Sequence, residues 1–359
     1  MVNDMGIQYD ILASTLRILR DREVDNTFRT IPLLEAVQRA GNVEMVDGGQ
    51  KVDHPVVLAE HSNITQLATG YESVNLAVKD ALRTASFDWC DFVAPVVITE
   101  KEQLSNKGSR AIIRIAEARL KSVMGMLKRE WCKQTVTGNS TVLSELNTLN
   151  GEGVNAAGAW GAATTTATTS GFLHRQAFGS QSTGSVGNIA RSSFQDSWNN
   201  QMADVTAGAP TDFATGGLKA MSNLMINTQI YAPEGEIDII LASPISYELY
   251  RNELTDQERY TSAEQTKDIV GKLILMYNGA SMYIDNGLGF TTLAGGQKVS
   301  MYFLNSKLFT VYFDKDAHFE MSDMERISGY AAASSNIMVR TQLAASHLAG
   351  LGVLLNGEA

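Results

Sequence analysis

The sequence predicts an α+β fold, and three observations carry this prediction. An extended, β-prone stretch, Val43–Val78, precedes a long helical segment, Ser105–Lys133. A compact mixture of helices and strands follows after residue 217, and the chain ends on strands. With 359 residues, 44% of them hydrophobic, the chain is long enough for one large or two modest domains with cores of their own.

Charged residues make up only 19% of the chain, which is a low fraction for a protein whose whole surface meets water. A surface of this kind suits a protein that covers itself with copies of itself, although an ordinary enzyme remains an alternative. The net charge of −10 and the pI of about 5.1 disfavour a general nucleic-acid-binding role.

The only two cysteines, Cys90 and Cys132, are 42 residues apart and form neither a CxxC site nor a disulfide framework. Met1–Asp10 lacks a basic segment followed by an apolar one, so no signal peptide is expected. No apolar run approaches the roughly 20 residues of a membrane span. We therefore expect a soluble protein made in a reducing cytoplasm.

The first segment, residues 7–41, is predicted to be helical and broken near Pro32. Pro32 fits the first turn of a second helix, Leu33–Ala40, and Gly41 fits the end of that helix. The first helix has apolar residues at helical spacing, namely Ile7, Ile11, Leu12, Leu16 and Leu19. It could pack on its own domain or lie across a neighbouring subunit.

Residues Val43–Val78 are predicted to form a long hairpin arm that turns at Asp47-Gly48-Gly49, because Asp-Gly between β-prone runs favours a hairpin. The part from Val52 to Tyr71 has too few apolar residues to fold alone. We expect it to lean on a partner chain.

A strand is predicted within Phe87–Glu100, where Pro95 indicates an edge strand or a bulge. The segment Ser105–Lys133 that follows is predicted to be a helix about 40 Å long, with Ser109 as its N-cap if it begins late. One face of this helix is apolar: Ile112, Ala116, Leu120, Val123, Leu127 and Trp131.

The same helix carries a basic stripe, formed by Lys107, Arg110, Arg114, Lys121 and Lys128. Eight basic and two acidic residues between Lys107 and Lys133 give a local charge of +6, so the rest of the chain carries −16. The stripe could be a solvated face paired with acidic neighbours, a surface toward DNA, or a contact with an acidic patch on another subunit.

Residues 140–217 are rich in Gly, Ala, Ser and Thr and poor in charge, which is typical of a linker or an elaborated loop region. We expect aromatic side chains to anchor it, namely Phe172, Phe178, Phe194 and Trp198.

After residue 217 the sequence predicts alternating helices and strands. The predicted helices are Leu218–Ile230 and Pro244–Leu254, the second capped by Ser243. The predicted strands are Ile237–Leu241, Leu273–Tyr277, Ala280–Ile284, Val299–Leu304, Lys307–Phe313, Asn336–Ala345 and Leu351–Leu355. Asn278-Gly279 and Asn305-Ser306 are expected to close two hairpins.

Catalytic signatures such as a P-loop, GxGxxG, GxSxG, HExxH or an EF-hand loop are absent from the sequence. Asp314, Asp316, His318 and Glu320 alternate and would share one face of a strand, which could hold a metal or serve an enzyme. The favoured interpretation is a solvent-facing strand surface, with Phe313, Ala317, Phe319 and Met321 on its inner face. His54 and His61 are likewise expected to be exposed or interface histidines rather than metal ligands.

The order of the predicted elements resembles the Hong Kong 97-type coat fold of tailed-bacteriophage major capsid proteins. Val43–Val78 resembles the extended loop of that family, and Phe87–Glu100 with Ser105–Lys133 resembles the strand and spine helix of its peripheral domain. The segment from Ile337 to Asn356 resembles its final strands. The resemblance is architectural and covers nearly the whole chain.

The resemblance implies the following division of the chain: an N-terminal arm, 1–42; an extended loop, 43–78; a peripheral domain, 79–139 with 321–359; and an axial domain, 140–320, with the insertion 140–217. Members of the family build hexamers and pentamers of an icosahedral head that encloses double-stranded DNA. The resemblance further implies that the chain is no enzyme, needs no cofactor, and resides in the virion after assembly in the host cytoplasm.

The expected intersubunit residues of the extended loop are Gln50, Lys51, His54, His61 and Tyr71. The resemblance also implies a portal, a decoration protein in some members, and a separate scaffolding protein, since only about 40 residues precede the arm. Some members crosslink a loop lysine to an asparagine, for which Lys51 and Asn356 would be the candidates, but no matching acid is evident. The alternatives are an encapsulin-like nanocompartment shell and an α/β enzyme that uses the Asp314–Glu320 face.

Overall fold

The computed structural model describes residues 32–58, 70, 73, 81–101, 119, 122–127, 130–131, 134–135, 145–147, 171–173, 185–194, 197–206, 212–231, 236–256, 265–267, 273–284 and 299–357. The predicted helix within residues 7–31 lies outside these ranges. No helix in the described part of the chain is long and apolar enough to cross a membrane.

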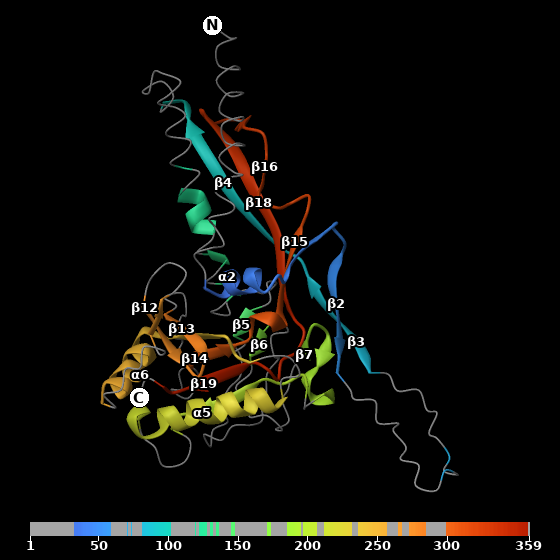
Figure 1. The fold of residues 1–359 in the computed structure, drawn as a ribbon. Coiled ribbons are helices and arrows are strands. Elements are labelled where there is room, and N and C mark those ends of the chain that lie inside the picture. The colour runs from blue at the N-terminus through green and yellow to red at the C-terminus, as the bar shows by residue number, and fades with distance from the viewer. Residues whose placement is uncertain are drawn as a thin grey trace, which may run out of the picture.

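A six-stranded sheet is built around one long strand, β18 (Ala332–Ala345). Along one edge β18 pairs with β4 (Cys90–Thr99) over ten residues, and along the other it pairs successively with three shorter strands. These are β15 (Phe309–Asp314), β16 (Glu320–Met321) and β17 (Glu325–Arg326); β1 (Val43–Val46) adds to β15 in parallel. Figure 1 shows the β4–β18 ribbon extending away from the rest of the molecule.

A seven-stranded sheet has the order β11-β12-β13-β10-β14-β19-β9. Its strands are β9 (Gln201–Asp204), β10 (Ile239–Ala242), β11 (Gln265–Lys267), β12 (Leu273–Tyr277), β13 (Ala280–Ile284), β14 (Val299–Leu304) and β19 (Gly352–Leu355). Helices α5 (Phe213–Tyr231) and α6 (Pro244–Asp256) pack against it. Met221, Leu224 and Met225 of α5 are buried in one cluster with Leu354 of β19.

Two of the connections between the sheets are short, and these two crossings lie side by side. The first is the 3-10 turn η2 (Ser306–Leu308) between β14 and β15, and the second joins β18 to β19. The backbone N–H of Ser346 donates to the carbonyl of Leu308 over 2.9 Å. The predicted hairpin through Asn305-Ser306 is therefore wrong, because the two strands that it would pair belong to different sheets.

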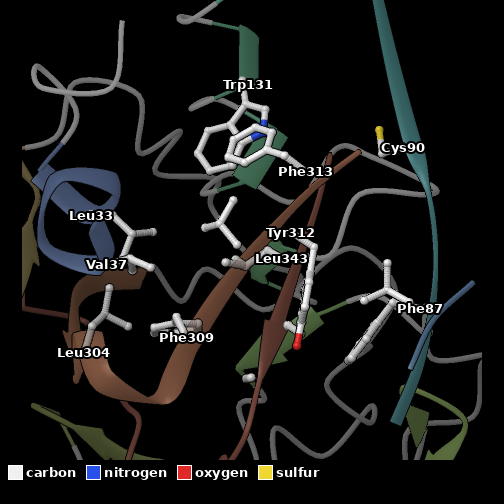
Figure 2. Packing of buried hydrophobic residues seen from close by; sticks show 14 of the residues in the cluster. Leu33, Val37, Phe87, Cys90, Trp131, Leu304, Phe309, Tyr312, Phe313 and Leu343 are labelled. Carbon is white, nitrogen blue, oxygen red and sulfur yellow. The ribbon is translucent and has the colours of Figure 1, made fainter. Parts of the chain in front are cut away.

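Helix α2 (Pro32–Arg39) covers the junction between the sheets. Leu33 and Val37 are buried and point toward Leu304 and Phe309 (Figure 2). Gly41 adopts φ +79° directly after the helix, which confirms the predicted C-terminal stop.

Two predictions about turns in the second half of the chain are confirmed. Asn278 and Gly279 have φ values of +50° and +91° and close the hairpin of β12 and β13. The Ser243 hydroxyl accepts the N–H of Ser246 over 2.9 Å and caps α6. Helix α5 begins five residues before the predicted start, where Asp212 accepts the N–H of Thr215 over 2.9 Å.

Three short two-stranded ribbons complete the part of the chain that the structure describes. They are β2 (Lys51–Val57) with β3 (Leu82–Asp88), β5 (Glu145–Asn147) with β6 (Gly171–Leu173), and β7 (Ser185–Val186) with β8 (Ile189–Ala190), the last followed by the 3-10 turn η1 (Arg191–Ser193). The predicted turn at residues 47–49 does not close a hairpin, because β1 pairs with β15 and β2 pairs with β3.

Residues 119, 122–127, 130–131 and 134–135 are helical, in agreement with the predicted long helix. Leu127 and Trp131 of its predicted apolar face are buried, together with Met124, in the core cluster that includes Phe313 and Leu343 (Figure 2). The full length of the helix remains a prediction.

Candidate functional site

The ribbon of β2 and β3, here called the arm root, is polar at one end of its exposed face and apolar at the other. Near β1 the Lys51 ammonium lies 3.0 Å from the Asp88 carboxylate. At the opposite end Val57 and Leu82 face each other in register and are 64% and 66% exposed. Residues 59–80 connect the strands at this apolar end, so the exposed pair marks a candidate contact with another molecule.

The inner face of the arm root packs on a segment of the same chain. The N–H of Ser86 donates to the carbonyl of Gly187 over 3.0 Å, and the Trp198 indole donates to the carbonyl of Val186 over 3.3 Å. Gly187 has φ +56°, and a Cβ there would lie 2.7 Å from the Ala85 Cβ. Only glycine permits this approach of the β7–β8 hairpin to the arm root.

The expectation that Val52–Tyr71 leans on a partner chain is wrong for its first residues. Val52, Val56 and Leu58 are buried within the chain's own core, and the Ser197 hydroxyl donates to the carbonyl of Leu58 over 2.8 Å. Trp198, one of the four aromatic anchors expected for the 140–217 insertion, is completely buried in the same core cluster. Composition alone could not find this contact because the partner lies about 140 residues away in sequence.

Side-chain hydrogen bonds tie the arm root to the six-stranded sheet at two described positions. The Gln342 amide of β18 donates to the carbonyl of Asp88, and His54 pairs with Tyr312 of β15. The Nδ1 atom of His54 lies 2.8 Å from the Tyr312 hydroxyl, and the two rings meet edge to face at 69°. Burial lowers the pKa of His54, although the nearby Glu44 carboxylate partly offsets that effect. Burial, together with Glu44, raises the pKa of Tyr312 to about 12, so the phenol keeps its proton.

The outer face of the β4–β18 ribbon is apolar in its middle and charged at one end. Val93 and Val97 are 56% and 39% exposed. At the charged end Arg340 donates to both oxygens of Asp91, over 2.6 and 3.1 Å, and approaches the buried Asp314 at 3.5 Å. The hydrogen bond to Asp91 raises the pKa of the Arg340 guanidinium.

Comparisons with models of known protein families and with curated proteins give no match. Solved structures do match. The capsid of cyanophage A-1(L) aligns with 89% of this chain and 92% of its own at a TM-score of 0.56, with 12% identity. The holo-SrpI encapsulin complex of Synechococcus elongatus PCC 7942 aligns with 91% of this chain and 88% of its own at a TM-score of 0.50, with 14% identity.

The chain has the Hong Kong 97-type coat fold.

The coat fold confirms the resemblance drawn from the order of elements, and the sheets show where the chain crosses the predicted domain limits. β15, from the predicted axial range, belongs to the six-stranded sheet with β4 and β18. β19, from the predicted peripheral range, belongs to the seven-stranded sheet. The domain division itself remains a prediction.

The predicted intersubunit residues are only partly described. Gln50 precedes β2, Lys51 pairs with Asp88, and His54 faces the molecule's own sheet rather than a neighbour. His61 and Tyr71 lie outside the described residues. All five residues of the basic stripe, Lys107, Arg110, Arg114, Lys121 and Lys128, also lie outside them.

Arg119, a basic residue of the same helix that the prediction left out of the stripe, donates to the carbonyl of Val97 on β4. This contact ties the helix to a strand that pairs, within the described residues, with β18 alone. A sequence pattern could not find it, because the acceptor is a backbone oxygen and carries no side-chain signal.

The continuous acidic strand face expected from Asp314 to Glu320 does not form. β15 ends at Asp314, which is buried, and β16 begins only at Glu320, because residues 315–319 turn with Phe319 at φ +52°. The described residues contain no group of three His, Cys, Asp or Glu side chains that could hold a metal. The apolar partners Phe313, Ala317, Phe319 and Met321 are buried as expected.

The two residues considered for a crosslink both have partners within the chain. Lys51 pairs with Asp88, and the Asn356 side-chain amide donates to Asp204 over 2.9 Å and approaches Thr206 at 3.3 Å. Asn356 also follows β19, in the sheet to which the arm root does not belong. Crosslinking therefore gains no support from the described geometry.

Cys90 is a buried free thiol, and burial raises its pKa to about 11. The thiolate form is scarce at neutral pH under these conditions, so Cys90 is a packing residue and no candidate nucleophile.

Proposed function

We propose that this chain is a shell subunit, the major capsid protein of a tailed bacteriophage, which assembles into hexamers and pentamers of an icosahedral head around double-stranded DNA. The observation that carries the proposal is the coat fold, matched over about nine-tenths of the chain by a phage capsid and by an encapsulin. A structural rather than catalytic role accords with both neighbours.

The surface of the subunit supports self-association. Val57, Leu82, Val93 and Val97 are exposed apolar side chains, and they lie on the outer faces of the β2–β3 and β4–β18 ribbons, whose inner faces join the core. Exposed apolar groups on such faces gain free energy when a neighbour covers them, by about 25 cal/mol per Å² of apolar area. Many such contacts of modest strength add up in a closed assembly.

An encapsulin-like nanocompartment is the second candidate, because the encapsulin shares the fold at nearly the same coverage. The comparisons fit the two candidates equally. We favour the phage coat because the +6 charge of residues 107–133 would suit a surface toward DNA. Scaffolding, portal and decoration proteins are the partners that this assignment implies.

An α/β enzyme is the remaining alternative, and it loses the continuous Asp314–Glu320 face on which it depended.

Electron microscopy of the purified full chain tests the proposal. Closed shells or sheets of hexameric and pentameric units are expected, whereas uniform small particles would contradict a shell function. Tail and portal genes beside its own gene would identify a phage coat, and a neighbouring cargo enzyme gene without them would identify a nanocompartment.

A further inference from the structure

Two side-chain hydrogen bonds in the described residues join the arm root to the six-stranded sheet: Gln342 of β18 donates to the carbonyl of Asp88, and His54 pairs with Tyr312. The second of them involves a titratable group. His54 lies in the middle of β2, between the buried Val52 and Val56 in the alternating pattern of that strand. Its imidazole is half-buried and bonded to the hydroxyl of Tyr312, which belongs to β15. The contact joins positions 258 residues apart and so links the ribbon to a distant strand.

Protonation of His54 would disturb this contact in two ways. In the neutral ring one nitrogen accepts, so an unprotonated Nδ1 accepts the Tyr312 hydroxyl; in the imidazolium both nitrogens donate. Tyr312 would then have to accept, and its own proton would lose its acceptor. The charged ring would also remain in a partly desolvated position, which costs free energy.

The charged groups around His54 offset this cost only in part. Glu44 of β1 is the one carboxylate that attracts the imidazolium electrostatically, and its effect is smaller than that of burial. On β3 the residue opposite His54 is Ala85, and Arg83 lies over the Phe194 ring at 6.0 Å. Lys51, Asp53 and Asp88 are on the exposed face of the ribbon.

We propose that the His54–Tyr312 contact is a latch, which adds to the core packing that holds the arm root on the six-stranded sheet at neutral pH and which loosens the ribbon when the imidazole takes up a proton. Binding of a proton weakens the His54–Tyr312 contact, and the ribbon of β2 and β3 is the element that moves.

The direction of the effect follows from linkage. Burial holds the folded-state pKa of His54 below its ordinary value of about 6.5, so the released state binds the proton more tightly. The latch is intact above about pH 6.5 and weakens as pH falls from there through the folded-state pKa. Each unit by which the pKa of His54 in the folded state lies below its pKa in the released state favours release about tenfold at low pH.

Hydrogen exchange of the full chain, followed by mass spectrometry, tests the latch. After division by the intrinsic rates, exchange in residues 51–58 and 82–88 should be faster near pH 5 than near pH 7.5. Exchange in β10, β13 and β14 should not show this increase. A ribbon with equal protection at both pH values would overturn the proposal.

Two variants assign the effect to this residue. His54→Gln keeps a group that can accept the Tyr312 hydroxyl but does not titrate, so the pH dependence should disappear. Tyr312→Phe removes the hydroxyl and keeps the ring, so the ribbon should exchange rapidly at both pH values, and this variant decides the matter if His54→Gln fails to fold. Persistence of the wild-type pH dependence in either variant would overturn the proposal.

His347→Gln is the matched control. His347 is also half-buried with a pKa lowered by burial, but it lies in the crossing between β18 and β19. This variant should retain the pH dependence of the arm root, and loss of that dependence would overturn the assignment to His54.

Discussion

Gly187 lies where the arm root and the β7–β8 hairpin meet, and it combines a left-handed backbone with a tight contact. A Cβ at this position would lie 2.7 Å from the Ala85 Cβ and 3.0 Å from the Phe87 ring. We predict that Gly187→Ala destabilises the subunit by about 2–4 kcal/mol, because overpacking adds to the cost of the left-handed conformation. Denaturant unfolding of the disassembled subunit measures the change.

Gly279→Ala is the matched control, since Gly279 also has positive φ, +91°, but nothing lies within 4 Å of its Cβ position. This variant should lose only about 1–2 kcal/mol. Equal losses at the two glycines would show that the close approach to Ala85 contributes nothing.

Arg340 connects three strands of the six-stranded sheet through Asp91 on β4 and Asp314 on β15. We predict that Arg340→Met costs about 1–3 kcal/mol, because Asp314 is buried and would lose a compensating charge. Asp91→Asn should cost less than about 1 kcal/mol, because Asp91 is 39% exposed and water screens the pair. Thermal unfolding of both variants checks this order, and the reverse order would contradict it.

At the level of elements, local turn chemistry predicted some connections and not others. Asn278-Gly279 supplied the positive φ values that a tight hairpin needs, so the sequence was sufficient there. Asn305-Ser306 looked similar, but the Asp238 carboxylate accepts both the Ser306 N–H, over 2.8 Å, and the Ser306 hydroxyl. A partner 68 residues away holds this turn, and the chain crosses to the other sheet.

The arm was located from its composition, but its pairing was not. β2 pairs with β3, whose residues follow the predicted end of the arm at Val78, and β1 joins β15 in parallel more than 260 residues away. Short strands of this kind carry no signal for the partner that they choose, because pairing depends on the rest of the core. The root of the arm consequently belongs to the folded body.

The division of the arm into a root, β2 and β3, and the connecting residues 59–80 can be tested by deletion. Residues 59–80 can be replaced by a short Gly-Ser turn, because the N–H of Leu58 donates to the carbonyl of Ala81 over 3.1 Å and the strand ends are adjacent. We predict a folded subunit that no longer forms closed shells. Circular dichroism would show the fold, and sedimentation would show the loss of assembly.

Removal of residues 51–58 is the contrasting deletion. It takes away Val52, Val56 and Leu58, and each buried side chain contributes about 1.5–3 kcal/mol. That variant should not fold. Normal shells formed by the variant that lacks residues 59–80 would contradict the role that we assign to the arm.

For the molecule as a whole, the order of elements was enough to indicate the coat fold, although the sequence has no short diagnostic motif. The order could indicate neither that β14–β15 and β18–β19 cross directly between the sheets nor that β1 with β15, β10 with β13, and β19 with β9 pair in parallel. Those features depend on contacts between distant segments. The expected interface residues of the arm and the basic stripe remain predictions, since most of them lie outside the described residues.

A cryo-electron microscopy reconstruction of particles formed by the purified full chain tests the shell assignment most directly. The account predicts closed particles made of hexamers and pentamers, with residues 59–80 of each copy in contact with a neighbouring subunit. A population of uniform monomers or small oligomers, with the arm folded entirely on its own chain, would contradict it.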